Sequence, residues 1–164
     1  AALQPSTNSY EDLLDAAYRI GVPPAELQQL FRSMVMNVLG GNVDDHNKNF
    51  SFLMGDDGVW HAAPAYDFTF SVDPSAPGYM NRHCMTIGNK NSDIGRGDLL
   101  ELAGRYNIKG ADAIIEKAIG VVSDYDRYAE RAGVSGYWCS RIKEETGYRI
   151  ENMSDVARHR GIGR

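Results

Sequence analysis

An apolar stripe between Pro24 and Leu39 constrains the fold of this chain more than any other feature. Its apolar side chains recur at intervals of three and four residues, which is the period of one face of an α-helix. The stripe comprises Leu27, Leu30, Phe31, Met34, Val35, Val38 and Leu39. Pro24 suits the first turn of a helix, and Gly40-Gly41 predicts an abrupt end. We therefore expect a long core helix over 24–39, in which the methionines serve packing.

The other expected elements are shorter and mostly helical. Ser9 is a suitable cap for a helix, and Gly55-Asp56-Asp57-Gly58 between two apolar runs predicts a β-hairpin turn. The stretch 69–82 is rich in Pro, Gly and Ser, as in a loop. We expect helices over 9–20, 98–106, 111–132 and 135–150, and strands over 50–54, 59–62 and 83–87. The predicted fold is mostly α with a small β-hairpin.

Composition narrows the class of protein. The chain has 164 residues, which suits one domain over 1–164, and its net charge of −5 argues against direct nucleic-acid binding. No apolar run is long enough to span a bilayer and no signal-peptide pattern occurs, so we expect a cytoplasmic protein without membrane contact.

We interpret Cys84 and Cys139 as reduced packing residues. The basic tail of Arg158, His159, Arg160 and Arg164 is interpreted as a solvated terminus.

A polar loop, Gly41 to Asn49, follows the long helix and contains the candidate catalytic residues. Asp44 and Asn49 are five residues apart on it, and Asp67 follows the hairpin. Phosphate transfer from ATP needs a carboxylate that orients or deprotonates the attacking hydroxyl, and oxygen ligands for Mg²⁺. Protein kinases place an Asp, an Asn five residues later and a second Asp after a hairpin. Lys48 adds a cation able to meet the transferring phosphate.

Other interpretations of the loop stay open on the residues alone. Asp and Asn favour turns by themselves, and a bare Asp followed by Asn five residues later is a weak signal. Asp44, Asp45 and His46 also suggest a zinc or iron site, but neighbouring loop residues rarely converge on one metal. A small-molecule phosphotransferase would use the same spacing of Asp and Asn.

Two stretches together give a more specific indication. Asn42-Val43-Asp44-Asp45-His46-Asn47-Lys48-Asn49-Phe50-Ser51 and Ala63-Pro64-Ala65-Tyr66-Asp67-Phe68 resemble the catalytic core of HipA-type kinases, the toxins of bacterial toxin–antitoxin pairs. The resemblance implies a protein-kinase-like C-lobe that uses ATP and Mg²⁺ to phosphorylate a serine or threonine. It also implies a HipB-like antitoxin as partner and a protein substrate such as an aminoacyl-tRNA synthetase.

The resemblance also assigns roles. Asp44 matches the catalytic base, and Asn49 and Asp67 match the magnesium ligands. The residues implied to contact ATP are His46, Asn47, Lys48, Asn49, Tyr66 and Asp67. Asp45 stands where the family varies, so we interpret it as a solvated acid. The motif gives no role to His61, His83 and His159, which we interpret as structural or solvent-facing.

The chain departs from the family in lacking the glycine-rich motifs that bind the phosphates of a nucleotide. Neither G-x-G-x-x-G nor G-x-x-x-x-G-K-[ST] occurs, so we expect the ATP-clamping N-terminal lobe to be absent from these 164 residues. It would belong to a longer chain or to a separately encoded lobe. Because half of the nucleotide contacts would be missing, we expect little activity from the chain alone. A non-catalytic module that binds an antitoxin, or a pseudokinase, is the alternative from another functional class.

Overall fold

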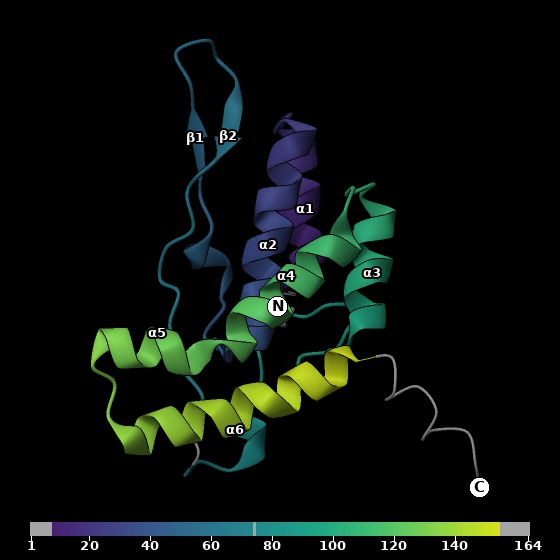
Figure 1. The fold of residues 1–164 in the computed structure, drawn as a ribbon. Helices are drawn as coiled ribbons and strands as arrows, with labels where there is room; N and C mark the ends of the chain where they lie inside the picture. Colours follow the sequence, from purple (N-terminus) through teal and green to yellow (C-terminus); the bar gives the residue numbers. More distant parts are fainter. Residues whose placement is uncertain (1–7, 74, 155–164) are drawn as a thin grey trace, which may run out of the picture.

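The computed structural model describes residues 8–73 and 75–154, and these are mostly helical (Figure 1). In chain order the helices and strands are α1 (Tyr10–Arg19), α2 (Pro24–Gly40), the 3₁₀ turn η1 (Asn47–Asn49), β1 (Phe52–Met54), β2 (Trp60–Ala62), the 3₁₀ turn η2 (Gly78–Met80), α3 (Arg96–Arg105), α4 (Ala111–Ser123), α5 (Tyr125–Ala132) and α6 (Gly136–Met153). The prediction of a mostly helical fold with one small hairpin is confirmed. The basic tail lies outside the described residues.

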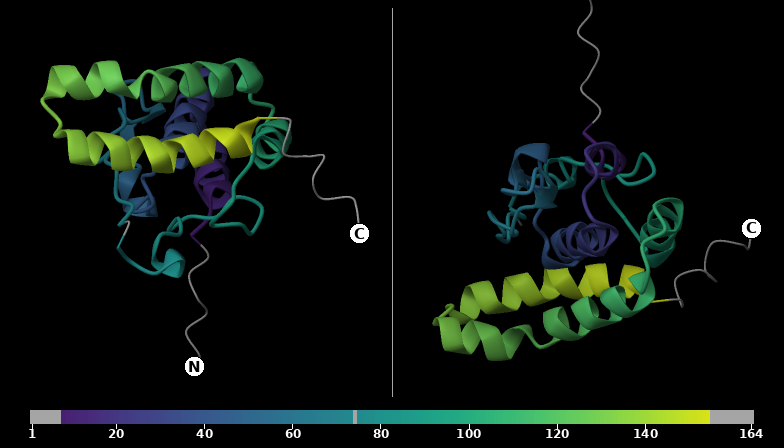
Figure 2. Two further views of the ribbon diagram at one scale, coloured as in Figure 1. Left: turned by 60° about the horizontal axis from the view of Figure 1, so that its bottom comes forward. Right: turned by 90° about the horizontal axis from the view of Figure 1, so that it is seen from above.

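Helix α2 is the centre of the core. It contacts α1, α4, α6 and β2, and Figure 2 shows α4 and α6 side by side across it. All seven residues of the predicted apolar stripe are buried. Pro24 occupies the first turn, where its missing N–H costs no hydrogen bond. The stripe is therefore the buried face of a helix, as its period predicted. This packing fixes the end of α2 relative to the rest of the core.

The β-hairpin projects beyond the helices and is attached to the start of α2 (Figure 1). Its two strands pair antiparallel, with Phe52 opposite Ala62 and Met54 opposite Trp60. The carboxylate of Glu26, in the first turn of α2, accepts hydrogen bonds from His61 Nδ1 at 2.8 Å and from the backbone N–H of Ala62 at 2.7 Å. One side chain thus ties β2 to the central helix, and His61 has a structural role.

Two predicted elements are wrong in detail. The expected strand over 83–87 is not a strand, because its pairing is limited to isolated bridges of Thr86 with Ser9 and of Ile87 with Lys90. The expected helix over 111–132 is divided into α4 and α5 at Asp124, whose N–H bonds back to the carbonyls of Gly120 and Val121. Val121-Val122-Ser123-Asp124 is a run of weak helix formers, and this lowers the cost of the break.

The cysteine prediction is also wrong for Cys84. Its side chain is exposed, while Cys139 is half-buried, and both are free thiols. The segment around Cys84 turns its neighbours His83 and Met85 inward, which leaves the cysteine facing out.

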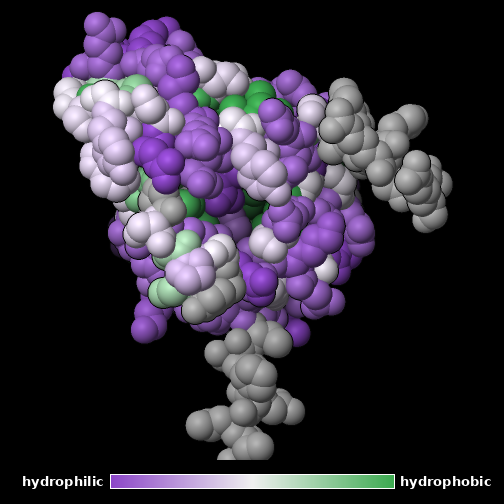
Figure 3. Space-filling model, turned by 90° about the horizontal axis from the view of Figure 1, so that it is seen from below, coloured by the Kyte–Doolittle hydropathy of each residue, from purple (hydrophilic) through white to green (hydrophobic). Residues whose placement is uncertain are grey.

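Figure 3 shows one face that is mostly hydrophilic, with hydrophobic residues in small separate areas. Among the helices of the described stretches, none combines the length and the apolar character needed to cross a membrane.

Candidate active site

The candidate site begins where α2 ends. Gly41 caps the helix in the left-handed conformation, with φ of 69°. A Cβ atom at this position would lie 3.0 Å from the ring of Phe70. Both the backbone angle and the close approach of Phe70 therefore require glycine here. The chain leaves α2 at a fixed angle and enters the polar loop predicted to carry the chemistry.

Within the loop, Asn49 is held against the backbone of Asp44. The Asn49 N–H donates to the carbonyl of His46 at 2.9 Å, which closes the turn η1. The Asn49 side-chain Nδ2 donates to the carbonyl oxygen of Asp44 at 3.0 Å. Asn49 is buried and Asp44 is exposed. Because the amide nitrogen is used internally, the amide oxygen of Asn49 is the atom left to bind a ligand.

The segment from Asp67 to Ser71 runs alongside this loop. Ser71 Oγ accepts hydrogen bonds from the N–H groups of Val43 at 2.8 Å and Asp44 at 3.1 Å, and the Ser71 N–H donates to Gly41 O at 3.0 Å. Asn42 Nδ2 donates to the backbone carbonyl of Asp67 at 3.3 Å. The structure therefore brings together the two segments that carry Asp44, Asn49 and Asp67.

The two acidic side chains are available to ligands. In the part of the chain that the structure describes, neither Asp44 nor Asp67 forms an ion pair, and Lys48 is also unpaired. The Asp44 carboxylate does meet the thiol of Cys84 at 3.8 Å. Burial, followed by the charges of Asp45 and Asp44, raises the pKa of the Cys84 thiol, so the thiol keeps its proton beside the acid.

Asp67 has an unusual backbone conformation. Its φ is 54°, in the left-handed region that side chains other than Asp and Asn rarely adopt. Such conformations cost of order 1 kcal/mol and collect at functional sites. The bond from Asn42 to the Asp67 carbonyl is one contact that holds the residue in this state.

The remaining predicted nucleotide contacts differ in accessibility. Asn47 and Lys48 are exposed. The hydroxyl of Tyr66 donates to the Lys48 carbonyl at 2.7 Å and lies 2.5 Å from Ser51 Oγ, so it fastens the segment before Asp67 to the loop. The ring of His46 is half-buried, and its Nδ1 is enclosed without a hydrogen-bond partner among the described residues.

Asp45 is not a solvated acid, which corrects the sequence-based interpretation. Its side chain is fully buried and accepts hydrogen bonds from Tyr10, His83 and the backbone of Cys84 and Met85. Sequence reasoning missed Tyr10, Asn37 and Asn42 as supports of the site. Asn37, a buried polar residue within the apolar end of α2, is the signal that could have revealed them.

The side chains of Asn49 and Asp67 offer donor atoms of the type that a magnesium ion prefers. Mg²⁺ prefers oxygen ligands and is usually bound by one or two protein side chains, with waters and substrate phosphates completing its shell. The Asn49 amide oxygen and the Asp67 carboxylate are donors of this kind. No group of three or more His, Cys, Asp or Glu side chains that could hold a metal occurs in residues 8–73 and 75–154.

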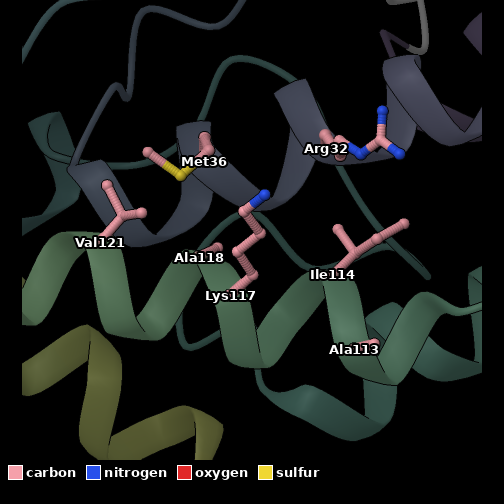
Figure 4. Close-up of a pocket in the computed structure, with 7 residues that line it drawn as sticks. All are labelled: Arg32, Met36, Ala113, Ile114, Lys117, Ala118 and Val121. Atoms are coloured by element: carbon pink, nitrogen blue, oxygen red, sulfur yellow. The ribbon is translucent and has the colours of Figure 1, made fainter.

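In the part of the chain that the structure describes, one groove adjoins the predicted site and another lies along the central helix. A groove of about 500 Å³ separates α1 from the loop, and its walls include Asn8, Asp12, Asn47, Phe50 and Phe52. The other, of about 370 Å³, lies between α2 and α4 (Figure 4). Its lining is Arg32, Met36, Ala113, Ile114, Lys117, Ala118 and Val121, which includes none of the predicted site residues.

Comparison with known proteins identifies a matching family and a relative. The family described as the HipA-like C-terminal domain matches residues 2–152. The protein named "Putative kinase Y4mE" of Sinorhizobium fredii (strain NBRC 101917 / NGR234) is 31% identical over 83 residues, which is 50% of this chain and 19% of that relative. The matched stretch thus spans about a fifth of the relative's length. Because the family match extends over nearly the whole chain, the chain belongs to the HipA-like C-terminal domain family.

Proposed function

We propose that this domain is the catalytic C-lobe of a kinase that uses ATP and Mg²⁺ to phosphorylate a serine or threonine hydroxyl. The observation that carries the proposal is the joining of two segments at the end of α2, one with Asp44 and Asn49 and the other with Asp67. Membership of the HipA-like family and similarity to a protein named as a kinase support phosphate transfer as the type of reaction.

Each side chain has a role that its surroundings permit. Asp44 is exposed on the loop and orients the attacking hydroxyl, from which it accepts the proton. Lys48 brings a positive charge to the transferring phosphate. The Asn49 amide oxygen and the Asp67 carboxylate would hold Mg²⁺. When bound, that ion neutralises charge on the phosphates.

The preference for a protein substrate rests on the family resemblance. The same resemblance leads us to propose a HipB-like antitoxin as partner and a substrate such as an aminoacyl-tRNA synthetase. The exposed positions of Asn47 and Lys48 leave both side chains accessible to a nucleotide.

The test compares three Asp→Asn variants in the intact protein that carries these residues. Asp44→Asn should lower kcat by about 100-fold or more with little change in KM for ATP, because the base acts in the chemical step. Asp67→Asn should raise the Mg²⁺ concentration needed for half-maximal rate. Asp56→Asn, in the exposed hairpin turn, is the matched control and should leave both quantities unchanged.

The assay follows transfer of the γ-phosphate of labelled ATP and identifies the phosphorylated residue. Label on serine or threonine is the expected product. Transfer that survives both Asp44→Asn and Asp67→Asn would overturn the proposal. Label found only on a small molecule would instead support the alternative phosphotransferase.

A further inference from the structure

We infer that Asp45 is a positioning residue, whose buried carboxylate helps to fix Asp44 relative to Asp67. The catalytic part of this inference rests on the proposed function. Asp45 does not touch the exposed face of the loop, so it acts through the residues to which it is bonded.

Both oxygens of the Asp45 carboxylate are occupied by donors from other parts of the chain. Oδ2 accepts from the hydroxyl of Tyr10 at 2.7 Å and from His83 Nδ1 at 2.9 Å. Oδ1 accepts from the N–H groups of Cys84 at 2.8 Å and Met85 at 3.4 Å. The residue next to Asp44 is thereby anchored to α1 and to the 83–85 segment.

On one side the network reaches α6. His83 is buried, and its Nε2 lies 3.4 Å from Arg149 Nη1. Since arginine has only donors, Nε2 is the acceptor and Nδ1 carries the proton that is donated to Asp45. Burial lowers the pKa of Arg149, and a second weak bond joins its Nη1 to the carbonyl of Val38 at 3.4 Å. The network therefore also holds α6 against the end of α2.

On the other side the network reaches Asp67. Asn37 Nδ2 donates to the Tyr10 hydroxyl at 3.0 Å, and Asn42 Nδ2 donates to Asn37 Oδ1 at 3.0 Å and to the Asp67 carbonyl at 3.3 Å. Burial, and then the charge of Asp45, raise the pKa of Tyr10 well above its ordinary value, so the hydroxyl keeps its proton. An unbroken chain of hydrogen bonds joins the Asp45 carboxylate to the backbone of Asp67.

This arrangement accounts for how two distant segments keep one geometry. Asp44 and Asp67 have exposed side chains, and the buried bonds of their neighbours set where their backbones lie. A hydrogen-bonded network in a water-excluded interior is rigid, and second contacts of this kind hold catalytic groups in place. A shift of about 1 Å between such groups is enough to slow phosphate transfer.

Tyr10→Phe is the variant that tests the inference. Removing Asp45 itself would endanger folding, whereas Tyr10→Phe deletes one hydroxyl and keeps the ring packed edge-on against Phe50 at 5.9 Å. Tyr106→Phe is the matched control. Its hydroxyl lies 2.7 Å from Asp15 Oδ1 and 3.0 Å from Glu11 O, so it links the end of α3 to α1, away from the loop.

In the intact protein, Tyr10→Phe should lower kcat for phosphate transfer about tenfold. It should leave KM for ATP unchanged, while Tyr106→Phe should alter kcat less than about twofold. Both variants should lower the thermal midpoint by similar amounts. If Tyr10→Phe keeps the kcat of an active wild type, or if both variants lose kcat equally, the positioning role is wrong.

Hydrogen exchange of the 164-residue chain provides a readout that needs no activity. Three N–H groups, those of Val43, Asp44 and Ser71, are bonded between the joined segments, and the Cys84 N–H is bonded to Asp45. Tyr10→Phe should speed their exchange about tenfold relative to the rest of the chain, and Tyr106→Phe should not. If Tyr10→Phe leaves the exchange rates of these four N–H groups unchanged, the inference is wrong, even if the variant has lost kinase activity. An inactive wild-type protein overturns the proposed function, and the exchange pattern still decides whether the network joins the segments.

Discussion

Asp45→Ala gives the sharpest stability test of the buried network. The carboxylate is fully buried, and its loss leaves four donors without this acceptor, namely the Tyr10 hydroxyl, the His83 Nδ1–H and the N–H groups of Cys84 and Met85. Each unsatisfied buried donor costs about 1–3 kcal/mol, and several are left together at this site. We expect a loss of about 4 kcal/mol in the free energy of unfolding.

Urea unfolding followed by circular dichroism measures this loss. Asp44→Ala is the control one residue away, because its side chain is exposed, and it should change the free energy of unfolding by less than about 0.5 kcal/mol. For a chain of this size the expected loss corresponds to a fall of roughly 8–16 °C in Tm. A loss below about 1 kcal/mol for Asp45→Ala would refute the reasoning, since that is the behaviour of a surface acid.

Two further predictions concern the ends of α2. Gly41→Ala should cost about 1–2 kcal/mol for its backbone angle, and more because of the Phe70 contact at 3.0 Å. Gly21→Ala, at a similar φ with open space around it, should show the backbone cost alone in the same urea experiment. At the other end, the hydrogen bond to His61 lowers the pKa of Glu26 and raises the pKa of His61. The pair therefore stabilises the fold most between the ordinary pKa values of 4.5 and 6.5, and loses this effect as pH falls through the folded pKa of Glu26 or rises through that of His61. Urea midpoints measured across this range should show a maximum that Glu26→Gln flattens, and an unflattened maximum would contradict the assignment.

Features with a strong local signal were predictable from the sequence. The period of the apolar stripe predicted α2, and the turn residues Gly55 to Gly58 predicted the hairpin. Ser9 caps α1 as expected, with its hydroxyl accepting from the Asp12 N–H at 3.0 Å. These elements depend on neighbours in sequence, so local chemistry was sufficient to find them.

Features that depend on distant contacts were not predictable. The burial of Asp45 requires α1 and the 83–85 segment to pack on the loop, and neither partner is near it in sequence. The segment around 83–87 has the composition of a strand, but its backbone pairs with single residues at Ser9 and Lys90. The loop with Asp44 and Asn49 was visible as a motif, whereas its attachment to Asp67 through Asn42 was not.

The central claim is that Asp44 serves phosphate transfer to a hydroxyl. The most direct measurement is a single-turnover experiment in the intact protein, with saturating ATP and Mg²⁺, that compares wild type with Asp44→Asn. We expect that both proteins bind ATP equally and that Asp44→Asn transfers the γ-phosphate at least about 100-fold more slowly. Equal rates of transfer in the two proteins would contradict it.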